Sequence, residues 1–228
     1  MSQLFNFKIT ILLLLGTIQT STLDAQKVLN VDIEQIKTLT SEITSANYYP
    51  TLLNRFIEAD STLSSKQLHF LYYGKYSQTF YHPYDPVDGQ TEMYNSIELK
   101  EFDAALIYGQ RAFDLDPLDL KTLFGLSLCH YYLGNEIKMD KYLLMYYSLI
   151  SVILESGTGT SEEEAFVVMS ISDEYELINT LHKKVKKQKL INGTTDLIYL
   201  QKSKDKELNF LKKLYFNIEL PLLKVSEQ

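Results

Sequence analysis

Residues 102–134, FDAALIYGQRAFDLDPLDLKTLFGLSLCHYYLG, constrain the fold of this chain more than any other segment. Ala105 and Ala112 lie on one face of a helix, where their small side chains allow a neighbouring helix to approach closely. Pro117 cannot continue that helix, so it forces a turn. The segment therefore predicts a helix, a proline-marked turn and a second helix that packs back against the first.

This spacing resembles the tetratricopeptide repeat, whose helix pairs hold partners and seldom carry chemistry. The residues at its expected positions are Phe102, Ala105, Ala112 and Pro117, then Leu123, Leu126, Ser127 and Gly134. The flanks depart from the pattern. Glu92 and Met93 stand where a large apolar and a small residue are due, and a proline is missing at Ser151. Because three or more repeats normally share a core, we expect the N-terminal helices to supply the missing packing.

We expect the helical region to span residues 26–155. Its N-terminal part contains helical spacing from Val28 to Ile43, a helix capped by Asn47, and a helix that starts at Ser64 or Ser65. Residues 81–89, YHPYDPVDG, are expected to form a loop because they contain two prolines and a glycine.

The character of the chain changes at residues 156–161, a linker that begins SGTGT, and a C-terminal subdomain is expected at 162–228. The β-branched run at 165–171 is typical of a strand, and apolar residues alternate at 196–202 and 213–220. Ser172 is expected to cap a helix. The predicted fold class is α+β, mostly α: antiparallel helical hairpins, resembling the tetratricopeptide repeat, followed by a small antiparallel β-sheet with one helix.

Residues 1–25 have the features of a secretory signal peptide. Lys8 precedes an apolar run from Ile9 to Ile18, and Ala25 supplies a small residue for cleavage. The alternative is a membrane anchor, but the run is shorter than the roughly 20 residues that span a bilayer. We therefore expect an exported protein without a transmembrane span.

The formal net charge of −7 disfavours non-specific binding to nucleic acid. One basic run, HKKVKKQK at 182–189, is expected at the end of the helix capped by Ser172, where lysines interact well with the helix dipole. An anionic partner is the alternative for this run. The only cysteine, Cys129, excludes an internal disulfide and is expected to be a small buried residue.

A family resemblance covers most of the chain after residue 25. It rests on YYPTLLNRFIEADSTLSSKQLHFLYYGKYSQTFYHPY at 48–84, ISDEYEL at 171–177 and KKLYFNIELPL at 212–222. These segments resemble an uncharacterised domain-of-unknown-function family of exported Gram-negative bacterial proteins. The resemblance implies a location in the periplasm or at the outer surface, and it implies no activity.

The aromatic block at residues 71–84 is the best candidate for a binding site. Its candidate residues are Tyr72, Tyr73, Tyr76, Tyr81, His82 and Tyr84. The functional interpretation is a groove for a peptide, a glycan or an apolar ligand, because one helix face cannot bury all of these rings. The interpretation that we favour is that the rings pack on neighbouring helices, with their hydroxyl groups hydrogen-bonded there.

The sequence offers little support for catalysis or for a cofactor. The four histidines have no metal-ligand spacing, so we expect neither zinc nor another cofactor. Asp85 and Asp88 lack the regular ligands of a calcium loop and are expected to stabilise a turn. The SGTGT segment lacks the lysine of a phosphate-binding loop.

These features favour a non-enzymatic binding or assembly scaffold in the cell envelope, which holds a peptide or protein partner. The rival hypothesis is an envelope hydrolase, or a hydrolase inhibitor, with a cleft between the helices and the sheet. Ser172, Asp173 and Glu174 are the residues that would line such a cleft, although helix capping explains them more simply. The oligomeric state does not follow from the sequence.

Overall fold

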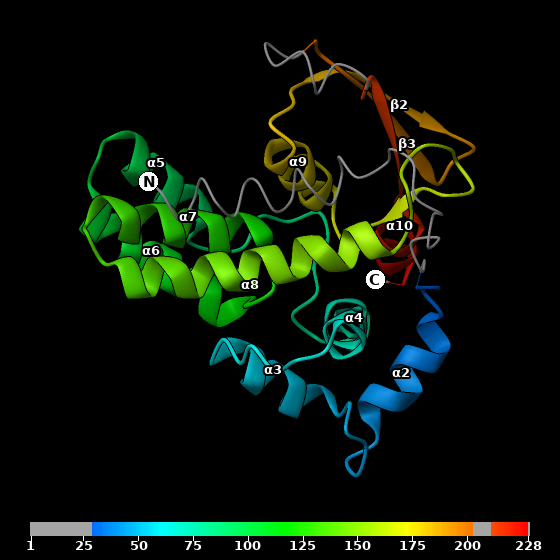
Figure 1. The fold of residues 1–228 in the computed structure, drawn as a ribbon, viewed down its shortest axis with the longest axis horizontal. Coiled ribbons are helices and arrows are strands. Elements are labelled where there is room, and N and C mark those ends of the chain that lie inside the picture. Colours follow the sequence, from blue (N-terminus) through cyan, green and yellow to red (C-terminus); the bar gives the residue numbers. More distant parts are fainter. Residues whose placement is uncertain (1–28, 203–210, 228) are drawn as a thin grey trace, which may run out of the picture.

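The computed structural model describes residues 29–202 and 211–227, and Figure 1 shows their arrangement. In these residues nine α-helices and one short 3₁₀-helix accompany a sheet of four strands. The predicted α+β, mostly helical class is therefore confirmed. The signal peptide predicted at residues 1–25 lies outside the described residues.

Most of the helices precede the sheet. They are α2 (Ile33–Ser41), α3 (Tyr49–Ile57), α4 (Ser65–Gly74), η1 (Lys75–Ser77), α5 (Gln90–Glu98), α6 (Phe102–Leu115), α7 (Leu120–Tyr132) and α8 (Glu136–Glu155). The C-terminal part contains β1 (Phe166–Val167), α9 (Ile171–Thr180), β2 (Val185–Ile191), β3 (Thr195–Leu200), β4 (Lys213–Asn217) and α10 (Glu219–Ser226).

Helix α8 runs through the middle of the molecule and contacts α7 and α4 (Figure 1). Helices α2 and α3 pack on α4, whereas α9 packs on α7. The start of α4 agrees with its prediction, because Ser64 and Gln67 form a reciprocal capping box there. The predicted cap of α3 was wrong: Tyr48 holds the cap position, and the helix begins with Tyr49 and Pro50.

The turn predicted at Pro117 is confirmed. Helix α6 ends at Leu115, and α7 begins at Leu120 behind the side-chain cap of Asp119. The Asp119 carboxylate accepts a hydrogen bond from the backbone N–H of Thr122 at 2.6 Å. Helices α5 to α8 pack each on the next through short turns. Their assignment to the tetratricopeptide repeat stays a prediction.

Met93 of α5 is the side chain that brings α5, α6 and α7 together. It is fully buried, and it lies against Gly109 of α6 and Gly125 of α7. A Cβ atom at Gly109 would lie 2.6 Å from the Met93 sulfur, and one at Gly125 would overlap the Met93 methyl group. The methionine that breaks the repeat pattern is thus accommodated by two glycines on facing helices.

The four strands form a mixed sheet in the order β1-β4-β3-β2. Strands β2 and β3 are antiparallel, as are β3 and β4, but β1 and β4 are parallel. The sheet is therefore not wholly antiparallel as predicted. The reason is that α9 carries the chain from β1 across to β2 in a crossover, which leaves these two strands pointing the same way.

The predicted position of the basic run, at the end of a helix, was wrong. Helix α9 ends at Thr180, and β2 takes up Val185–Ile191 at the edge of the sheet. The cap of α9 is Ser170 rather than Ser172, with Asp173 completing a capping box. Exposed lysines mask the strand pattern of β2, yet lysine is common on edge strands because its charge opposes pairing with another chain.

The predicted linker at 156–161 is held against the sheet. The Ser156 hydroxyl accepts a hydrogen bond from the Val167 N–H at 2.9 Å, and the Gly159 carbonyl accepts one from the Tyr215 N–H at 3.0 Å. The segment thus contacts both β1 and β4.

In residues 29–202 and 211–227, no helix has the length and apolar character needed to cross a membrane.

The contact of Met93 with the two glycines gives a prediction about stability. We expect Gly109→Val to lower the free energy of unfolding by about 1–3 kcal/mol, because the added carbons press on Met93 and Leu126 in a packed core. Adding Met93→Ala should recover part of this loss, because it frees the space that valine needs. Denaturant unfolding of both single variants and the double variant measures the coupling. Strictly additive losses in the free energy of unfolding would contradict this coupling.

Candidate functional site

The six candidate residues of the aromatic block differ in how far they are buried. Tyr72, Tyr73 and Tyr81 are buried, whereas Tyr76 is partly buried. His82 and Tyr84, in the proline-rich loop, are exposed. The six side chains therefore do not form one exposed aromatic surface.

The three buried tyrosines join the helices to the C-terminal part. The Tyr72 hydroxyl donates to the Asp173 carboxylate at 2.7 Å. The hydroxyl groups of Tyr73 and Tyr81 donate to the backbone carbonyls of Val167 and Met169, at 3.0 and 2.5 Å. These rings pack on neighbouring elements with their polar ends satisfied, so they cannot contact a ligand without opening the core.

A buried ion pair lies beside these tyrosines. The Lys75 ammonium group is 2.5 Å from the Asp116 carboxylate, and both residues are 7% exposed. Asp116 also accepts a hydrogen bond from the Leu118 N–H, in the turn between α6 and α7. Lys75 follows α4, and so the pair fixes the N-terminal helices to that turn. Burial lowers the pKa of Lys75, but Asp116 and Asp173 outweigh it and raise that pKa overall.

Two further carboxyl groups, those of Glu174 on α9 and Asp196 on β3, are joined through Gln188. Glu174 is 0% exposed, and its Oε1 atom has no hydrogen-bond partner. Gln188 of β2 donates to Asp196 of β3 at 2.5 Å and to Glu174 at 3.4 Å. Burial, with the nearby carboxylates of Asp196 and Asp173, raises the pKa of Glu174 to about 9. Glu174 is therefore a neutral acid near pH 7.

The residues proposed for a hydrolase cleft do not form an open site. Asp173 is buried, completes the capping box of α9 and accepts the Tyr72 hydrogen bond. Glu174 is buried beside Asp196, and Ser172 is partly buried. Burial raises the pKa of Asp173 to about 6, although Lys75 and Tyr72 oppose that rise.

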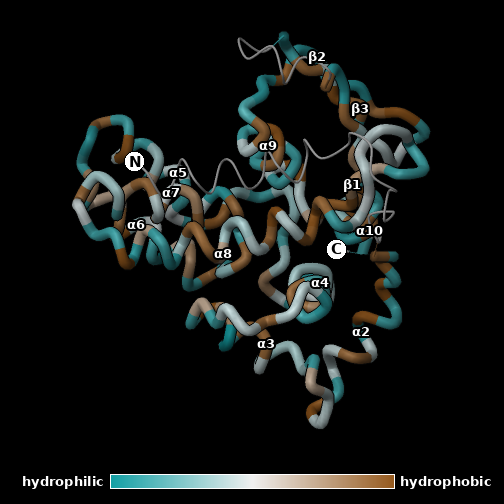
Figure 2. Tube along the Cα trace, viewed as in Figure 1, coloured by the Kyte–Doolittle hydropathy of each residue, from teal (hydrophilic) through white to brown (hydrophobic). Residues whose placement is uncertain are grey.

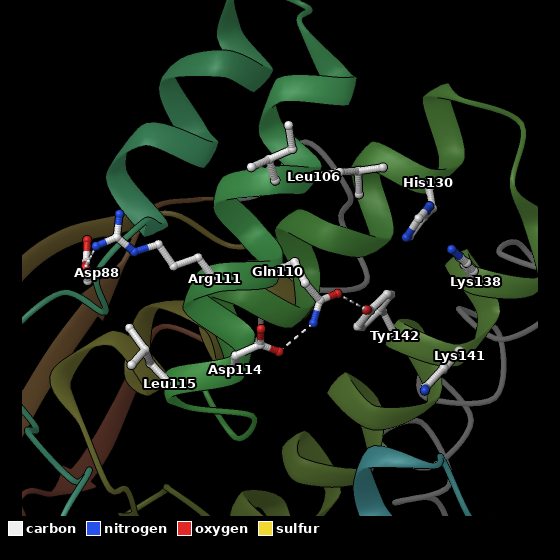
Figure 3. Close-up of a pocket in the computed structure, with 11 residues that line it drawn as sticks. Asp88, Leu106, Gln110, Arg111, Asp114, Leu115, His130, Lys138, Lys141 and Tyr142 are labelled. Carbon is white, nitrogen blue, oxygen red and sulfur yellow. Dashed lines mark hydrogen bonds and ion pairs between the residues drawn. The ribbon is translucent and has the colours of Figure 1, made fainter.

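A concave surface lies between α6 and α8, outside the aromatic block. This groove has a volume of about 780 Å³, and Figure 3 shows the side chains that line it. On α6 it presents the apolar side chains of Leu106, Ile107 and Leu115, and Ile107 is 73% exposed. On α8 it presents Lys138, Lys141 and Tyr142. The groove therefore combines an apolar wall with a basic one.

Hydrogen bonds hold the middle of this groove in place. Tyr142 donates to Gln110 at 3.3 Å, and Gln110 donates to Asp114 at 2.8 Å (Figure 3). At one end Arg111 forms an ion pair with Asp88. In the described part of the chain, Lys138 and Lys141 make neither an ion pair nor a hydrogen bond. Their charges are available to a partner.

The histidines of the chain lie in different surroundings. His69 is buried, and burial followed by the charge of Lys66 lowers its pKa to about 4. The His130 ring stacks on Tyr142 with a centroid distance of 5.6 Å. Across the residues that the structure describes, no three His, Cys, Asp or Glu side chains are arranged to hold a metal ion. Cys129 is buried as a free thiol.

Neither the ion pair nor the groove was predicted from the sequence. A lysine among tyrosines gives no local sign of its partner, since Asp116 lies 41 residues further along the chain. The groove did leave a signal: Ile107 and Leu115 are exposed apolar residues of α6, whereas Ala105 and Ala112 on the same helix are buried. Apolar residues outside the packed face of a helix are candidates for contact with a partner.

The comparisons with known proteins identify a family. A family model described as "Domain of unknown function (DUF4919)" matches residues 34–227. No curated protein and no solved structure matches the chain. The resemblance to a domain-of-unknown-function family is thus confirmed, whereas export from a Gram-negative cell stays a prediction.

The buried ion pair gives a prediction about stability. Lys75→Met should lower the free energy of unfolding by about 3–5 kcal/mol, because it leaves the Asp116 carboxylate buried without a counter-charge. Adding Asp116→Asn should restore much of the loss, because the amide oxygen can still accept from Leu118. Thermal and denaturant unfolding of the three variants provides the measurement. A double variant as unstable as Lys75→Met would show that the unpaired charge is not the cause.

Glu174 gives a prediction about pH. Folding raises the pKa of Glu174 from 4.5 to about 9, so the unfolded chain loses this proton first and stability falls as the pH rises through that interval. Glu174→Gln should remove this part of the slope and be more stable than the natural chain at pH 8, by about 1 kcal/mol or more. Urea unfolding from pH 5 to 8 measures the difference. The exposed Glu98→Gln is the control, and an equal slope in both variants would refute the assignment.

Proposed function

The chain belongs to this family of domains of unknown function, and from its own surface we propose that it is a binding scaffold for a partner protein. The scaffold is tetratricopeptide-like and non-enzymatic, and it acts after export, in the periplasm or at the outer surface. Its groove between α6 and α8 holds an extended segment of the partner that carries acidic and apolar side chains.

The α6–α8 groove is the observation that carries this proposal. A segment lying in it would cover Ile107 and Leu115 with its apolar side chains, which removes exposed apolar surface from water. Acidic side chains of the same segment would face Lys138 and Lys141. Complementary charge of this kind selects among partners and speeds their association.

The arrangement of the groove supports binding without rearrangement. Its walls belong to two long helices, and Gln110 connects Tyr142 of α8 to Asp114 of α6. A groove already in its bound form loses less conformational entropy when a partner binds. The rival hypothesis requires an open cleft between the helices and the sheet, but three buried tyrosine rings fill that junction at α4.

A site-specific photocrosslinker at position 107 tests this function in envelope extracts. We expect it to capture a partner through a segment rich in acidic and apolar residues, identified by mass spectrometry. The double variant Lys138→Glu/Lys141→Glu should weaken that capture at least about tenfold, because like charges then face each other.

The matched control reverses two lysines on the edge strand, Lys186→Glu/Lys187→Glu. It changes the net charge by the same amount but leaves the groove intact, so capture should be unchanged. Equal loss in both double variants would indicate a general charge effect and overturn the groove as the binding surface. Capture through a basic segment would also overturn the proposal.

A further inference from the structure

A second cavity, distinct from the α6–α8 groove, lies where α9 crosses α7 and α8. Its volume is about 290 Å³. Its apolar walls include Phe124 and Tyr131 of α7 and Tyr146 and Tyr147 of α8. In Figure 1, α9 lies beside these two helices on the side away from α4. The volume is at the lower end of the range for small-molecule sites.

One carboxyl group reaches this aromatic cavity. Glu176 of α9 lines it and is 7% exposed. The Tyr146 hydroxyl lies 2.7 Å from the Thr180 hydroxyl and 3.4 Å from Glu176 Oε2. The Thr180 hydroxyl in turn donates to the Glu176 backbone carbonyl at 2.9 Å. This network holds the carboxyl group beside a space whose walls are mainly aromatic and aliphatic side chains.

The surroundings of Glu176 leave its negative charge poorly compensated. Burial raises its pKa to about 7, the Asp119 and Asp173 carboxylates add to the rise, and Tyr146 and Lys121 oppose it. On the α5 side, burial and then the charge of Glu176 raise the pKa of the Tyr94 hydroxyl. His182 lines the cavity as well. A cation placed against Glu176 would stabilise the ionised carboxylate.

We propose that this cavity binds a small organic cation, with its ammonium group against Glu176 and its apolar body between the aromatic rings. The face of an aromatic ring attracts a cation, and the attraction grows when water is excluded. A carboxylate with several rings around it therefore favours an ammonium ion over a neutral molecule of the same shape. The size of the cavity fits a monoamine with one ring rather than a nucleotide.

Calorimetric titration with 2-phenylethylammonium tests the proposal, and 2-phenylethanol serves as the neutral probe of nearly the same shape. The ammonium ion should bind at least about tenfold more tightly than the alcohol at pH 8. Its affinity should fall by up to about tenfold at pH 6, since Glu176 is then mostly protonated. Equal affinity for the two probes, or no binding of the ammonium ion at millimolar concentration, would overturn the proposal.

Two variants test separately how the charge of Glu176 and the aromatic walls of the cavity contribute to binding. Glu176→Gln keeps the shape and should remove both the preference for the ammonium ion and its pH dependence. Phe124→Ala removes a partly exposed ring, so the chain should still fold, and it should weaken binding of both probes. The control is Glu136→Gln, an exposed carboxyl group at the start of α8, which should bind like the natural chain. Unchanged affinity in Glu176→Gln would refute the assigned role of this residue.

Discussion

The buried pair of Lys75 and Asp116 is the interaction on which the arrangement of the helices depends. It joins the segment after α4 to the turn between α6 and α7, two parts of the chain that no short connection holds together. A charge in the interior is costly unless its partner and its hydrogen bonds are in place. The pair therefore favours one position of α4 over others that would bury similar apolar area.

Tyr72 and Tyr73 of α4, together with Tyr81 in the loop that follows, extend this constraint to the sheet. The Tyr72 hydroxyl donates to Asp173, which is 101 residues further along the chain and completes the capping box of α9. Tyr73 and Tyr81 bind the backbone just before that helix. The end of α4 and the loop after it thus set the position of β1 and α9, and with them the place where α9 meets α7 and α8.

The sequence predicted what depends on neighbouring residues. The small residues of α6, the turn at Pro117 and the capping box of α4 are local patterns, and each is present. What it could not predict depends on distant partners. The tyrosine hydroxyls, the ion pair and the parallel pairing of β1 with β4 each join residues far apart in the chain. Strand β2 was missed because its lysines hide the strand pattern.

The charged edge of the sheet bears on how molecules of this protein meet one another. Lys186, Lys187 and Lys189 are exposed along β2, whose outer side has no neighbouring strand in the described residues. Two copies that approached edge to edge would bring their positive charges together before any backbone hydrogen bond could form. The β2 edge is long enough for a fibre to begin there. In a crowded compartment, the repulsion between lysines opposes the growth of such a fibre.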